Sequence, residues 1–470
     1  MTKKFYITTP IYYVNDVPHI GHTCTTLVAD IIARYHKLLG EEVFFLTGTD
    51  EHGAKIAEAA KKSGLTPKKF CDQVSKNFQE IWPKLNIQYG YFIRTTNPQH
   101  ERIVQEFIEK IYKKGDIYKD KYEGFYCVAC EKFVTETDLV DGKCPFHPTQ
   151  KLQKQTEINY FFRLSKYVPK LIKAIEKNEY LILPKAKRKE VLTKLKAGVN
   201  DLSISRASVS WGIPIPWDKK QTIYVWFDAL LNYYTALKIN RKENFWPPTL
   251  HLIGKEILWF HTVVWQAMLL SAGISLPKAI FAHSFYTIDG QKMSKSLGNV
   301  ISPQQLLEKF GVDGTRYLIA SSFPYENDAD VGWKKFEEKY NADLANGLGN
   351  LVARVAKLCE KTNFNPPSSE DKYHPDKFKE FHKLMLEYKV NEALEFVWEK
   401  ISKADKYIND TQPWLLEGEK LNKILNYLVK EIREIALLLI PFMPETSQKI
   451  RQQFSGPKIK SQKPLFPRIN

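Results

Sequence analysis

The sequence has no uninterrupted apolar run of the roughly 20 residues needed to span a bilayer. Its first residues, Met1 to Ile7, lead directly into an apolar, strand-like run and show neither the layout of a signal peptide nor that of a transit peptide. There is also no internal repeat and no long low-complexity segment. These absences argue against a membrane, secreted or repeat protein, and they predict a globular protein of the cytoplasm.

Two common nucleotide-binding fingerprints are missing as well. No Gly-x-x-x-x-Gly-Lys-Ser/Thr phosphate loop occurs. The run Gly347-Leu348-Gly349-Asn350 resembles the start of a dinucleotide fingerprint, but it lacks the third glycine and lies in a helical stretch. We therefore interpret these glycines as packing residues, and any nucleotide must be held in another way.

Acidic residues are in deficit, since 53 Asp and Glu face 69 Lys and Arg and give a formal net charge of +16 at pH 7. Such a surplus favours a polyanion as partner, because lysines and arginines that bind phosphates release condensed counterions. A lysine-rich surface that is merely solvated gives the same count, so charge alone leaves both interpretations open. A chain of 470 residues is long enough for about two to four domains.

Cysteine is sparse, with six in the chain, and three of these stand alone as Cys24, Cys71 and Cys359. The others form two short-spaced pairs with one histidine, Cys127-x-x-Cys130 and Cys144-x-x-His147. Four such ligands are typical of a closed, tetrahedral and structural zinc site. A pair of redox thiols is the alternative, and the third cysteine and the histidine argue against it. The layout predicts one structural Zn²⁺ per chain in a reducing compartment.

The order of elements predicts an α/β domain that is interrupted and then completed. Residues 5–8 and 43–46 suit strands, and 24–39 suit a helix that Gly40 ends, which makes a βαβ unit and implies a parallel sheet. Strand-like runs return at 223–226, 250–253 and 279–283, with a helical stretch at 256–270. From about residue 333 onward the pattern is helical, with an exposed loop at 363–378.

We therefore expect a Rossmann-type parallel-sheet catalytic domain, interrupted by a zinc-binding insertion and followed by an all-α helix bundle. The predicted boundaries are 1–115 and 219–284 for the two halves of the sheet domain, 116–218 for the insertion, 285–335 for a linking region and 336–470 for the bundle. The insertion carries a basic run, Lys185, Lys187, Arg188 and Lys189.

Two distant segments have the chemistry to handle a nucleotide. His19-Ile20-Gly21-His22 lies at the loop-to-helix junction after the first strand, where a helix N-terminus favours phosphate. Lys292-Met293-Ser294-Lys295-Ser296 follows the turn signal Asp289-Gly290 and can close over a triphosphate with two ammonium groups. Taken singly, they could be incidental loop histidines and a solvated charged loop. Occurring together in this order, they indicate one shared ATP site.

The pair resembles the signature motifs of class I aminoacyl-tRNA synthetases, and the surrounding residues resemble those of methionyl-tRNA synthetases. The similar segments are Thr8 to Asn15, Thr47 to Gly53, Tyr224 to Tyr233, Gly254 to Ile257 with Phe260 and His261, Asn341 to Arg354, and Thr411 to Trp414. The resemblance spans essentially the whole chain, and the zinc spacing matches the family's single-knuckle form.

The resemblance implies a role for each matching residue. His19, Gly21, His22, Gly254, Glu256, Lys292 and Lys295 would bind ATP with Mg²⁺, and His19, His22, Lys292 and Lys295 would be catalytic. Asp50 would pair with the ammonium group of methionine, and the side-chain pocket would consist of Ile11, Tyr13, Trp226, Ala229, Leu230, Tyr233, Ile257 and His261. A thioether is apolar and polarisable and favours aromatic neighbours, although Trp226 and Tyr233 would also suit an ordinary core.

The same resemblance assigns the helical part of the chain to RNA. Asn350, Arg354 and Trp414 would read the CAU anticodon of tRNA(Met), since Asn and Arg can bond base edges and Trp can stack on an unpaired base. A helix cap, a surface ion pair and a core indole are the alternatives that the residues alone would favour. Some members carry a further C-terminal dimerisation domain, which has no counterpart here, so we expect a monomer.

The implied activity is that of a methionine–tRNA ligase, an ATP-dependent enzyme that forms methionyl-adenylate and then transfers methionine to tRNA(Met) for translation. Three alternatives share part of the pattern. A synthetase for valine, isoleucine or cysteine would share the ATP motifs. A small-molecule nucleotidylyltransferase would not need the helical bundle, and a tRNA-binding module without catalysis would not need the histidines, the lysine loop or Asp50.

Overall fold

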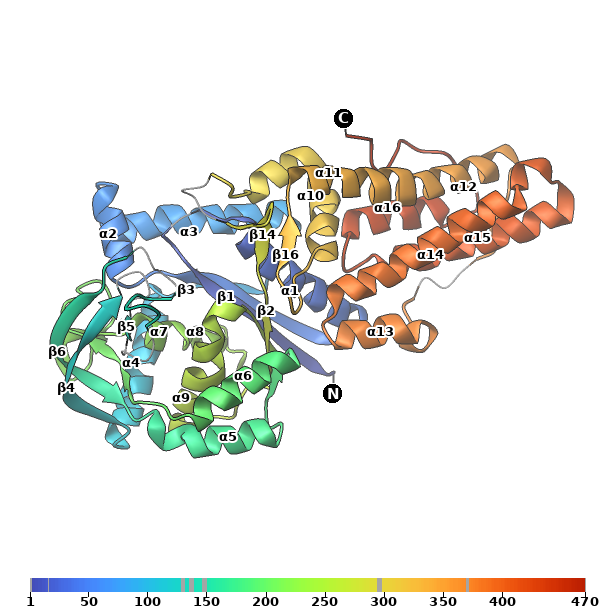
Figure 1. The fold of residues 1–470 in the computed structure, drawn as a ribbon. Coiled ribbons are helices and arrows are strands. Elements are labelled where there is room, and N and C mark those ends of the chain that lie inside the picture. Colours follow the sequence, from blue (N-terminus) through green and yellow to red (C-terminus); the bar gives the residue numbers. More distant parts are fainter. Residues whose placement is uncertain are drawn as a thin grey trace.

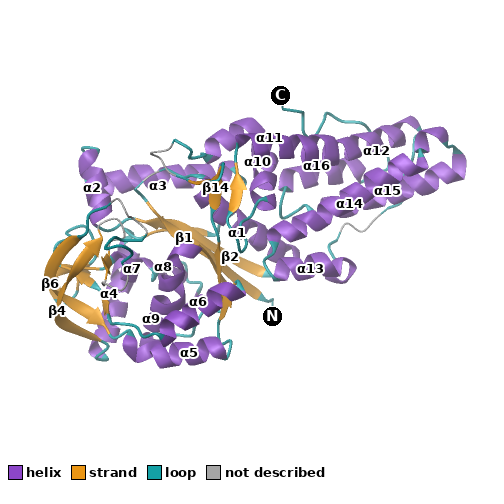
Figure 2. Ribbon diagram, in the orientation of Figure 1, coloured by secondary structure: helices purple, strands orange, loops and turns teal. Residues whose placement is uncertain are grey.

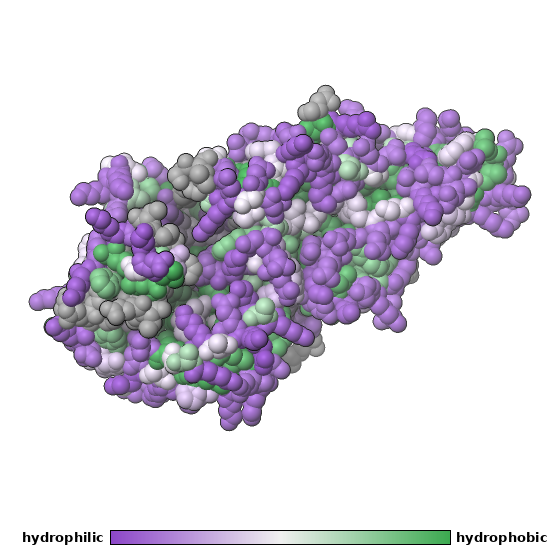
Figure 3. Space-filling model, viewed as in Figure 1, coloured by the Kyte–Doolittle hydropathy of each residue, from purple (hydrophilic) through white to green (hydrophobic). Residues whose placement is uncertain are grey.

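A computed structural model describes residues 2–15, 17–127, 132–134, 139–145, 150–293, 298–368 and 372–469. A twisted sheet covered by helices forms one end of the molecule, and an elongated helical bundle forms the other (Figures 1 and 2). Hydrophilic side chains cover most of the face shown in Figure 3. Within the described residues, no helix has the length and apolar character that crossing a membrane requires.

The central sheet has six strands in the order β3-β2-β1-β12-β13-β7, and every neighbouring pair is parallel. The predicted parallel-sheet domain is thus confirmed. The strands are β1 (Lys4–Tyr13), β2 (Glu42–Asp50), β3 (Tyr91–Arg94), β7 (Leu181–Leu183), β12 (Leu250–Gly254) and β13 (Ala279–His283). Strands β2 and β3 lie on one side of β1, whereas β12 and β13 lie on the other. A crevice for ligands is expected where the strand order reverses, beyond the carboxyl ends of β1 and β12.

Helices cover both faces of this sheet because its strands bury alternate residues on opposite sides. Phe5 and Ile7 of β1 belong to one core, and Tyr6 belongs to the other. The flanking helices are α1 (Ile20–Leu38), α2 (Ala54–Lys62), α3 (Pro67–Lys84), α4 (Pro98–Lys113), α8 (Asn232–Ile239) and α9 (Trp265–Ala272). Helix α1 matches the predicted helix and ends before Gly40, whose φ of 78° suits glycine.

The predicted insertion does form a second sheet, but part of it returns to the first. Its antiparallel strands run in the order β5-β4-β6-β8, namely β4 (Ile117–Cys127), β5 (Lys132–Val134), β6 (Gln153–Phe162) and β8 (Leu202–Ser203). Between β6 and β8 lie α5 (Val168–Glu176), β7 and α6 (Lys185–Lys196). Because β7 pairs with β13, residues 116–218 are not a wholly separate body.

The predicted strand 223–226 is wrong after its first residue. Strand β11 (Asp218–Ile223) ends before Tyr224 and pairs with β9 (Ser205–Arg206) and β10 (Pro214–Ile215) in a small antiparallel sheet. The chain then turns into the short helix α7 (Val225–Ala229), whose Phe227 and Asp228 N–H groups donate to the Tyr224 carbonyl. Trp226 therefore lies on a helix, and not at a strand end.

The linking region consists of a three-stranded sheet and a helix that is kinked at Gly311. The strands are β14 (Tyr286–Ile288), β15 (Gln291–Lys292) and β16 (Ala329–Val331), and the helix is α10 (Pro303–Ser321). The Ser302 hydroxyl accepts from the Gln305 N–H and caps this helix. The predicted lysine loop starts on β15 and continues into residues 294–297, which lie outside the described residues.

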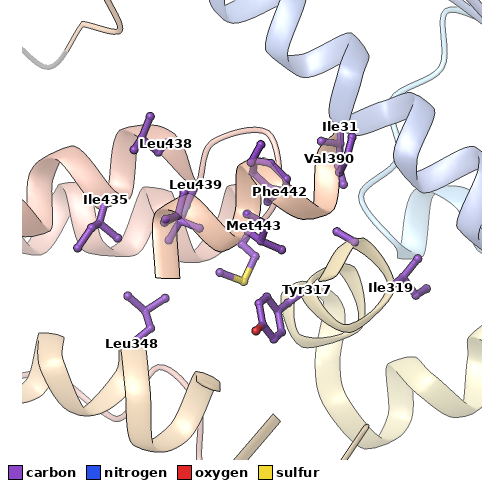
Figure 4. Close-up of a cluster of buried hydrophobic side chains, with 14 of the residues drawn as sticks. Ile31, Tyr317, Ile319, Leu348, Val390, Ile435, Leu438, Leu439, Phe442 and Met443 are labelled. Atoms are coloured by element: carbon purple, nitrogen blue, oxygen red, sulfur yellow. The ribbon is translucent and has the colours of Figure 1, made fainter. Parts of the chain in front are cut away.

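After β16, the described residues are helical or irregular. The helices are α11 (Trp333–Lys339), a π-helical stretch (Tyr340–Gly349), α12 (Asn350–Lys361), α13 (Lys379–Leu386), α14 (Val390–Thr411), α15 (Gly418–Leu438) and α16 (Pro444–Phe454). The predicted bundle is confirmed. Its core is continuous with that of α1, since Ile31 of α1 belongs to the same cluster as Val390 and Phe442 (Figure 4).

Candidate active site

The first motif forms the N-terminal end of α1, where β1 delivers the chain. The His19 Nδ1 accepts from the Gly21 N–H at 3.1 Å, and the His22 Nδ1 accepts from the His19 N–H at 3.3 Å. The two imidazole rings stack with their centroids 3.8 Å apart. The histidines thus replace the usual Ser/Thr and Glu of a capping box and satisfy the first N–H groups of the helix.

Both imidazoles are neutral near pH 7. Burial lowers the pKa of His19 to about 4, and burial together with the neighbouring His19 lowers the pKa of His22 well below its ordinary value. Since each Nδ1 accepts a backbone N–H, the proton of each neutral ring resides on Nε2. The motif therefore presents two neutral N–H donors at a helix N-terminus, a suitable arrangement for phosphate oxygens.

The second motif lies beside the first. The methyl carbon of Met293 is 3.6 Å from the position that a Cβ on Gly21 would occupy. The Ile20 N–H donates to the Ile301 carbonyl at 2.9 Å, which ties the start of α1 to the segment after the lysine loop. The two predicted motifs therefore lie next to each other at the start of α1. Lys292 is described, whereas Lys295 lies outside the described residues.

Gly254 and Glu256 follow β12, next to the end of β1 in the sheet. The Glu256 carboxylate lies so close over Gly254 that a Cβ at that position would overlap it. Desolvation raises the pKa of Glu256, and the charges of Lys255 and Lys292 oppose this effect. Because the charge of Lys292 lowers the pKa of Glu256, the start of the lysine loop lies near the carboxyl end of β12.

The predicted methionine-binding residues gather on one side of the sheet. Asp50 ends β2 in register with Tyr13 of β1, and Ile11 pairs with Gly48 two residues earlier. Burial raises the pKa of Tyr233, and the Asp50 carboxylate adds to this effect, so Asp50 lies near that ring. Half-buried members are Ile11, Tyr13, Trp226 and Ile257, and buried members are Asp50, Ala229, Leu230, Tyr233 and His261.

Four of these residues are joined in one chain of contacts. The His261 Nδ1 is 3.0 Å from the Ile257 carbonyl, which can only accept, so Nδ1 carries the proton. The His261 Nε2 therefore accepts from the Tyr233 hydroxyl at 2.7 Å. The Trp226 ring meets His261 edge-on at 6.4 Å and stacks on Phe260 at 4.2 Å. Burial lowers the pKa of His261 to about 4, which keeps the ring neutral.

Sequence reasoning missed a buried ionic cluster behind this pocket. The Asp228 carboxylate lies 2.6 Å from the His52 Nδ1 and 2.8 Å from the His100 Nε2. Burial alone would lower the pKa of His52, but Asp228 raises it well above the ordinary value, while His52 and His100 lower that of Asp228 despite its burial. The signal was a single acidic residue within the apolar run Tyr224 to Leu231.

This cluster connects two walls of the site. His52 follows the β2 end that carries Asp50, and Asp228 lies on α7 between Trp226 and Ala229. His100 adds a third attachment from α4, and its Nδ1 lies 2.7 Å from the Thr235 hydroxyl of α8. A nearby recess lined by Gly53, Ala54, Arg206, Val209, Trp211 and residues 222–225 contains none of the predicted methionine-binding residues.

The predicted zinc ligands are only half described. Cys127 and Cys144 are both buried and belong to one small cluster, against which Phe125, Leu139 and Leu152 pack. Cys130 and His147 lie outside the described residues. Among the described residues no group of three metal ligands lies together. Two buried thiols in one cluster fit half of a four-ligand zinc site.

The three predicted anticodon residues lie on the bundle. Asn350 and Arg354 share one turn of α12, and the Arg354 guanidinium contacts Asp405 and Asn409 of α14, each at 2.8 Å. Trp414 follows the end of α14 and is 53 % exposed, next to Leu415 at 69 %. An exposed indole is not a core residue, so the alternative of a buried structural role does not apply to Trp414.

Known proteins resemble this chain over its full length. The family model described as "tRNA synthetases class I (M)" matches residues 5–156 and 137–356. The methionine–tRNA ligase of Clostridium acetobutylicum is 42 % identical over 100 % of this chain and 78 % of its own, and that of Thermotoga maritima is 44 % identical over 96 % and 75 %.

Solved structures agree with these relatives. The Mycobacterium tuberculosis methionyl-tRNA synthetase in complex with methionyl-adenylate matches with a TM-score of 0.92 and 36 % identity, covering 99 % of this chain and 100 % of that one. The apo form of the same enzyme matches with a TM-score of 0.85 and 33 % identity, covering 100 % and 99 %. With the fold, both motifs and the relatives in agreement, the chain belongs to the class I tRNA synthetases of the M group.

Proposed function

We propose that this chain is a methionine–tRNA ligase, which activates methionine with ATP and then transfers it to tRNA(Met). The observation that carries the proposal is the meeting of the His19–His22 helix start with the Lys292–Met293 segment, beside a half-buried aromatic pocket. Relatives named methionine–tRNA ligase, at 42 % and 44 % identity, support this substrate pair.

In the first reaction, an oxygen of the methionine carboxylate attacks the α-phosphorus of ATP, and the bond to the bridging oxygen breaks to release pyrophosphate. His19 and His22 donate from Nε2 to phosphate oxygens, and Lys292 and Lys295 supply positive charge to the departing pyrophosphate. Mg²⁺ that accompanies ATP would neutralise further phosphate charge. Gly254 allows the nucleotide to approach the backbone, with Glu256 beside it.

The amino acid is bound by charge at one end and by rings at the other. Asp50 pairs with the ammonium group, and the pocket that includes Trp226, Tyr233 and His261 surrounds the thioether. Because the Tyr233 hydroxyl donates its hydrogen to His261, it can only accept a hydrogen bond from a ligand. In the second reaction, a ribose hydroxyl of the terminal tRNA nucleotide attacks the acyl carbon, and AMP leaves.

Amino-acid-dependent exchange of pyrophosphate into ATP tests the first reaction. We expect exchange with methionine and little with valine, isoleucine or cysteine, and Asp50→Asn should reduce it by about a hundredfold, because the ammonium loses the carboxylate that pairs with it. Lys295→Ala should reduce exchange severely while leaving tRNA binding nearly intact. Strong exchange with another amino acid and none with methionine would contradict the proposed substrate.

We further propose that Cys127, Cys130, Cys144 and His147 hold one structural zinc ion. The shared buried cluster of Cys127 and Cys144 supports this, together with the spacing of the other two ligands. A closed site of this kind has no open position, so the ion would stabilise the tip of the β4–β6 sheet and take no part in the reaction.

Recognition of the CAU anticodon by Asn350, Arg354 and Trp414 is proposed for the bundle. The exposed Trp414 can stack on an unpaired base, and Arg354 is held by Asp405 and Asn409 in a fixed orientation. Trp414→Ala should raise the KM for tRNA(Met) without changing methionine-dependent exchange. The cytoplasm as the place of action and a monomeric state stay predictions, the latter tested by light scattering.

A further inference from the structure

Glu51 directly follows Asp50, and the proposed reaction assigns it no role. Its side chain is fully buried, so its carboxylate needs donors in place of the water that it has lost. The Arg94 guanidinium of β3 donates to it twice, from Nε to Oε1 at 2.7 Å and from Nη2 to Oε2 at 2.9 Å. The Thr49 hydroxyl donates to Oε1 at 2.7 Å, and the Thr96 hydroxyl donates to Oε2. These bonds fill the acceptor capacity of a carboxylate.

The main chain of Glu51 is held as firmly as its side chain. Its N–H donates to the Thr95 hydroxyl at 2.9 Å. Its carbonyl accepts from the Trp211 indole N–H at 2.6 Å and from the Cys71 thiol of α3 at 3.4 Å. The Gly53 N–H donates to the Trp211 carbonyl at 2.9 Å, which ties the turn after β2 to the segment between β9 and β10.

These bonds fix the peptide unit that joins Asp50 to Glu51. The N–H of this unit is held by Thr95, and its carbonyl, which belongs to Asp50, accepts from the Val14 N–H at 3.2 Å. Because a peptide unit is planar, holding both of its polar groups fixes the plane and limits how the Asp50 side chain can point. Asp50 is the residue to which the ammonium group of methionine is assigned.

Fold stability is the ordinary explanation for a buried ion pair. Such a pair is in general no more stabilising than apolar residues of similar volume, so stability alone does not account for this one. The second carboxylate on the same guanidinium differs from Glu51. Asp72 of α3 accepts from Arg94 Nη2 at 2.5 Å, but it is 46 % exposed and also pairs with Lys68 at 2.6 Å.

We propose that Glu51, held by Arg94, is a positioning residue that aims the Asp50 carboxylate at the ammonium group of methionine. The proposal rests on the ligase function, and within it on the role of Asp50. Glu51 itself is buried behind the turn and acts through its neighbour. A binding group must be held to within a fraction of an ångström, so a looser turn should weaken the contact with the ammonium and leave the ATP contacts at the start of α1 unchanged.

The main test is Glu51→Gln, which keeps the size of the side chain and removes its charge. The amide nitrogen cannot accept a hydrogen bond, so the donors on one side of the group lose their acceptor. Methionine-dependent pyrophosphate exchange is measured with separate titrations of methionine and ATP. We expect the KM for methionine to rise about tenfold and the KM for ATP to stay within about threefold.

Two further measurements distinguish positioning of Asp50 from a general loss of structure. If Glu51 acts through Asp50, adding Glu51→Gln to Asp50→Asn should change the KM for methionine by less than about twofold, because residues that act as a unit are not additive. Methioninol keeps the ammonium group, whereas the desamino analogue of methionine lacks it. As inhibitors of exchange by Glu51→Gln, methioninol should bind about tenfold more weakly and the desamino analogue as before.

The matched control is Asp72→Asn, which removes the exposed carboxylate from the same guanidinium and should leave the KM for methionine within about twofold. Arg94→Lys is a milder variant that applies even where Glu51→Gln does not fold. It keeps the positive charge but loses the two parallel bonds, so the KM for methionine should rise about threefold.

Four results would overturn the role of Glu51. These are an unchanged KM for methionine in Glu51→Gln or Arg94→Lys, an equal rise in Asp72→Asn, additive effects in the double variant, or equal weakening of both inhibitors. A failure of the ligase proposal looks different, because the unmodified protein itself would then show no exchange with methionine.

Discussion

Replacement of Asp228 by Asn tests whether the buried His52–Asp228–His100 cluster holds the methionine pocket in shape. The substitution keeps the size of the side chain but removes the charge that His52 requires. Asp228 is 1 % exposed, and His52 is 3 % exposed, so water cannot replace the lost partner. Removing one member of a buried ion pair costs about 3–5 kcal/mol, and the Glu101 carboxylate, 3.6 Å from the His52 Nε2, offsets part of this loss.

The expected thermal effect follows from this free energy. For a domain of this size, about 1 kcal/mol shifts the melting temperature by 2–4 °C, so Asp228→Asn should lower Tm by roughly 10 °C. The functional effect is separate. Because Asp228 lies on α7 between Trp226 and Ala229, loosening the helix moves one wall of the pocket relative to Asp50, and a shift near 1 Å can cost on the order of a hundredfold in rate.

The assay is methionine-dependent pyrophosphate exchange with separate titrations of methionine and ATP. We expect the KM for methionine to rise at least tenfold and the KM for ATP to stay within about threefold. Asp116→Asn is the matched control, because Asp116 is equally buried and bonds Ser271 and Lys166 far from the pocket residues. A variant that melts early yet keeps the KM for methionine would refute the positioning role, and an unchanged Tm would refute the ion pair.

Three further outcomes follow from the same contacts. The stability difference between the unmodified protein and Asp228→Asn should be largest between about pH 4 and 6.5 and shrink as pH rises above 6.5. The lowered pKa of Asp228 stabilises the fold above about pH 3.9, and the raised pKa of His52 stabilises it fully only below about pH 6.5. Chemical denaturation at several pH values measures this difference, and a pH-independent difference would contradict the expectation. Tyr233→Phe should raise the KM for methionine about tenfold and lower stability by about 1–3 kcal/mol, since the buried Nε2 of His261 loses its donor; an unaltered KM would remove Tyr233 from the pocket. We expect elemental analysis to find roughly one zinc per chain in the unmodified protein and none in Cys144→Ser. Cys359→Ser should keep the zinc, because burial raises the pKa of that bundle thiol to about 12. Equal zinc content in both variants would exclude the proposed ligands.

Elements whose signal is local were predictable from the sequence. Helix α1 shows the 3.6-residue period, a glycine just after its end and histidines at its start, and the structure matches it closely. Strands β12 and β13 lie close to their predicted positions, whereas β1 and β2 contain the predicted runs 5–8 and 43–46 but extend several residues beyond them. The two ATP motifs were recognisable because each combines an unusual residue set with a turn or a helix start.

Elements that depend on distant partners were not predictable in the same way. β7 is a run of three residues, Leu181–Leu183, whose pairing with β13 joins segments far apart in the chain. Nothing local indicates a parallel partner. Tyr224 to Trp226 has strand-like composition, yet α7 forms because Asp228 bonds His52, 176 residues earlier, and His100, 128 residues earlier. The protonation of His19 and His22 likewise depends on burial and on which backbone groups meet each Nδ1.

A buried ion pair between distant residues explains how the bundle and the catalytic domain act as one body. Arg316 of α10 is fully buried and donates to Asp30 of α1 at 2.7 Å, although the two residues are 286 positions apart. It also donates to the Pro441 and Phe442 carbonyls, in the turn between α15 and α16, at 2.9 and 2.8 Å. Burial lowers the pKa of Arg316, and Asp30 opposes this.

This cation therefore fixes the bundle against the helix whose other end carries the ATP motif. Hydrophobic side chains of α1, α10 and the bundle pack around the same junction (Figure 4), so the two parts share a core as well as an ion pair. Removing one partner of such a pair costs about 3–5 kcal/mol, which is a large fraction of a typical folding free energy. A tRNA that contacts Arg354 and Trp414 on the bundle thus meets an active site at a set distance, because α1 and α15 cannot move apart without exposing Arg316.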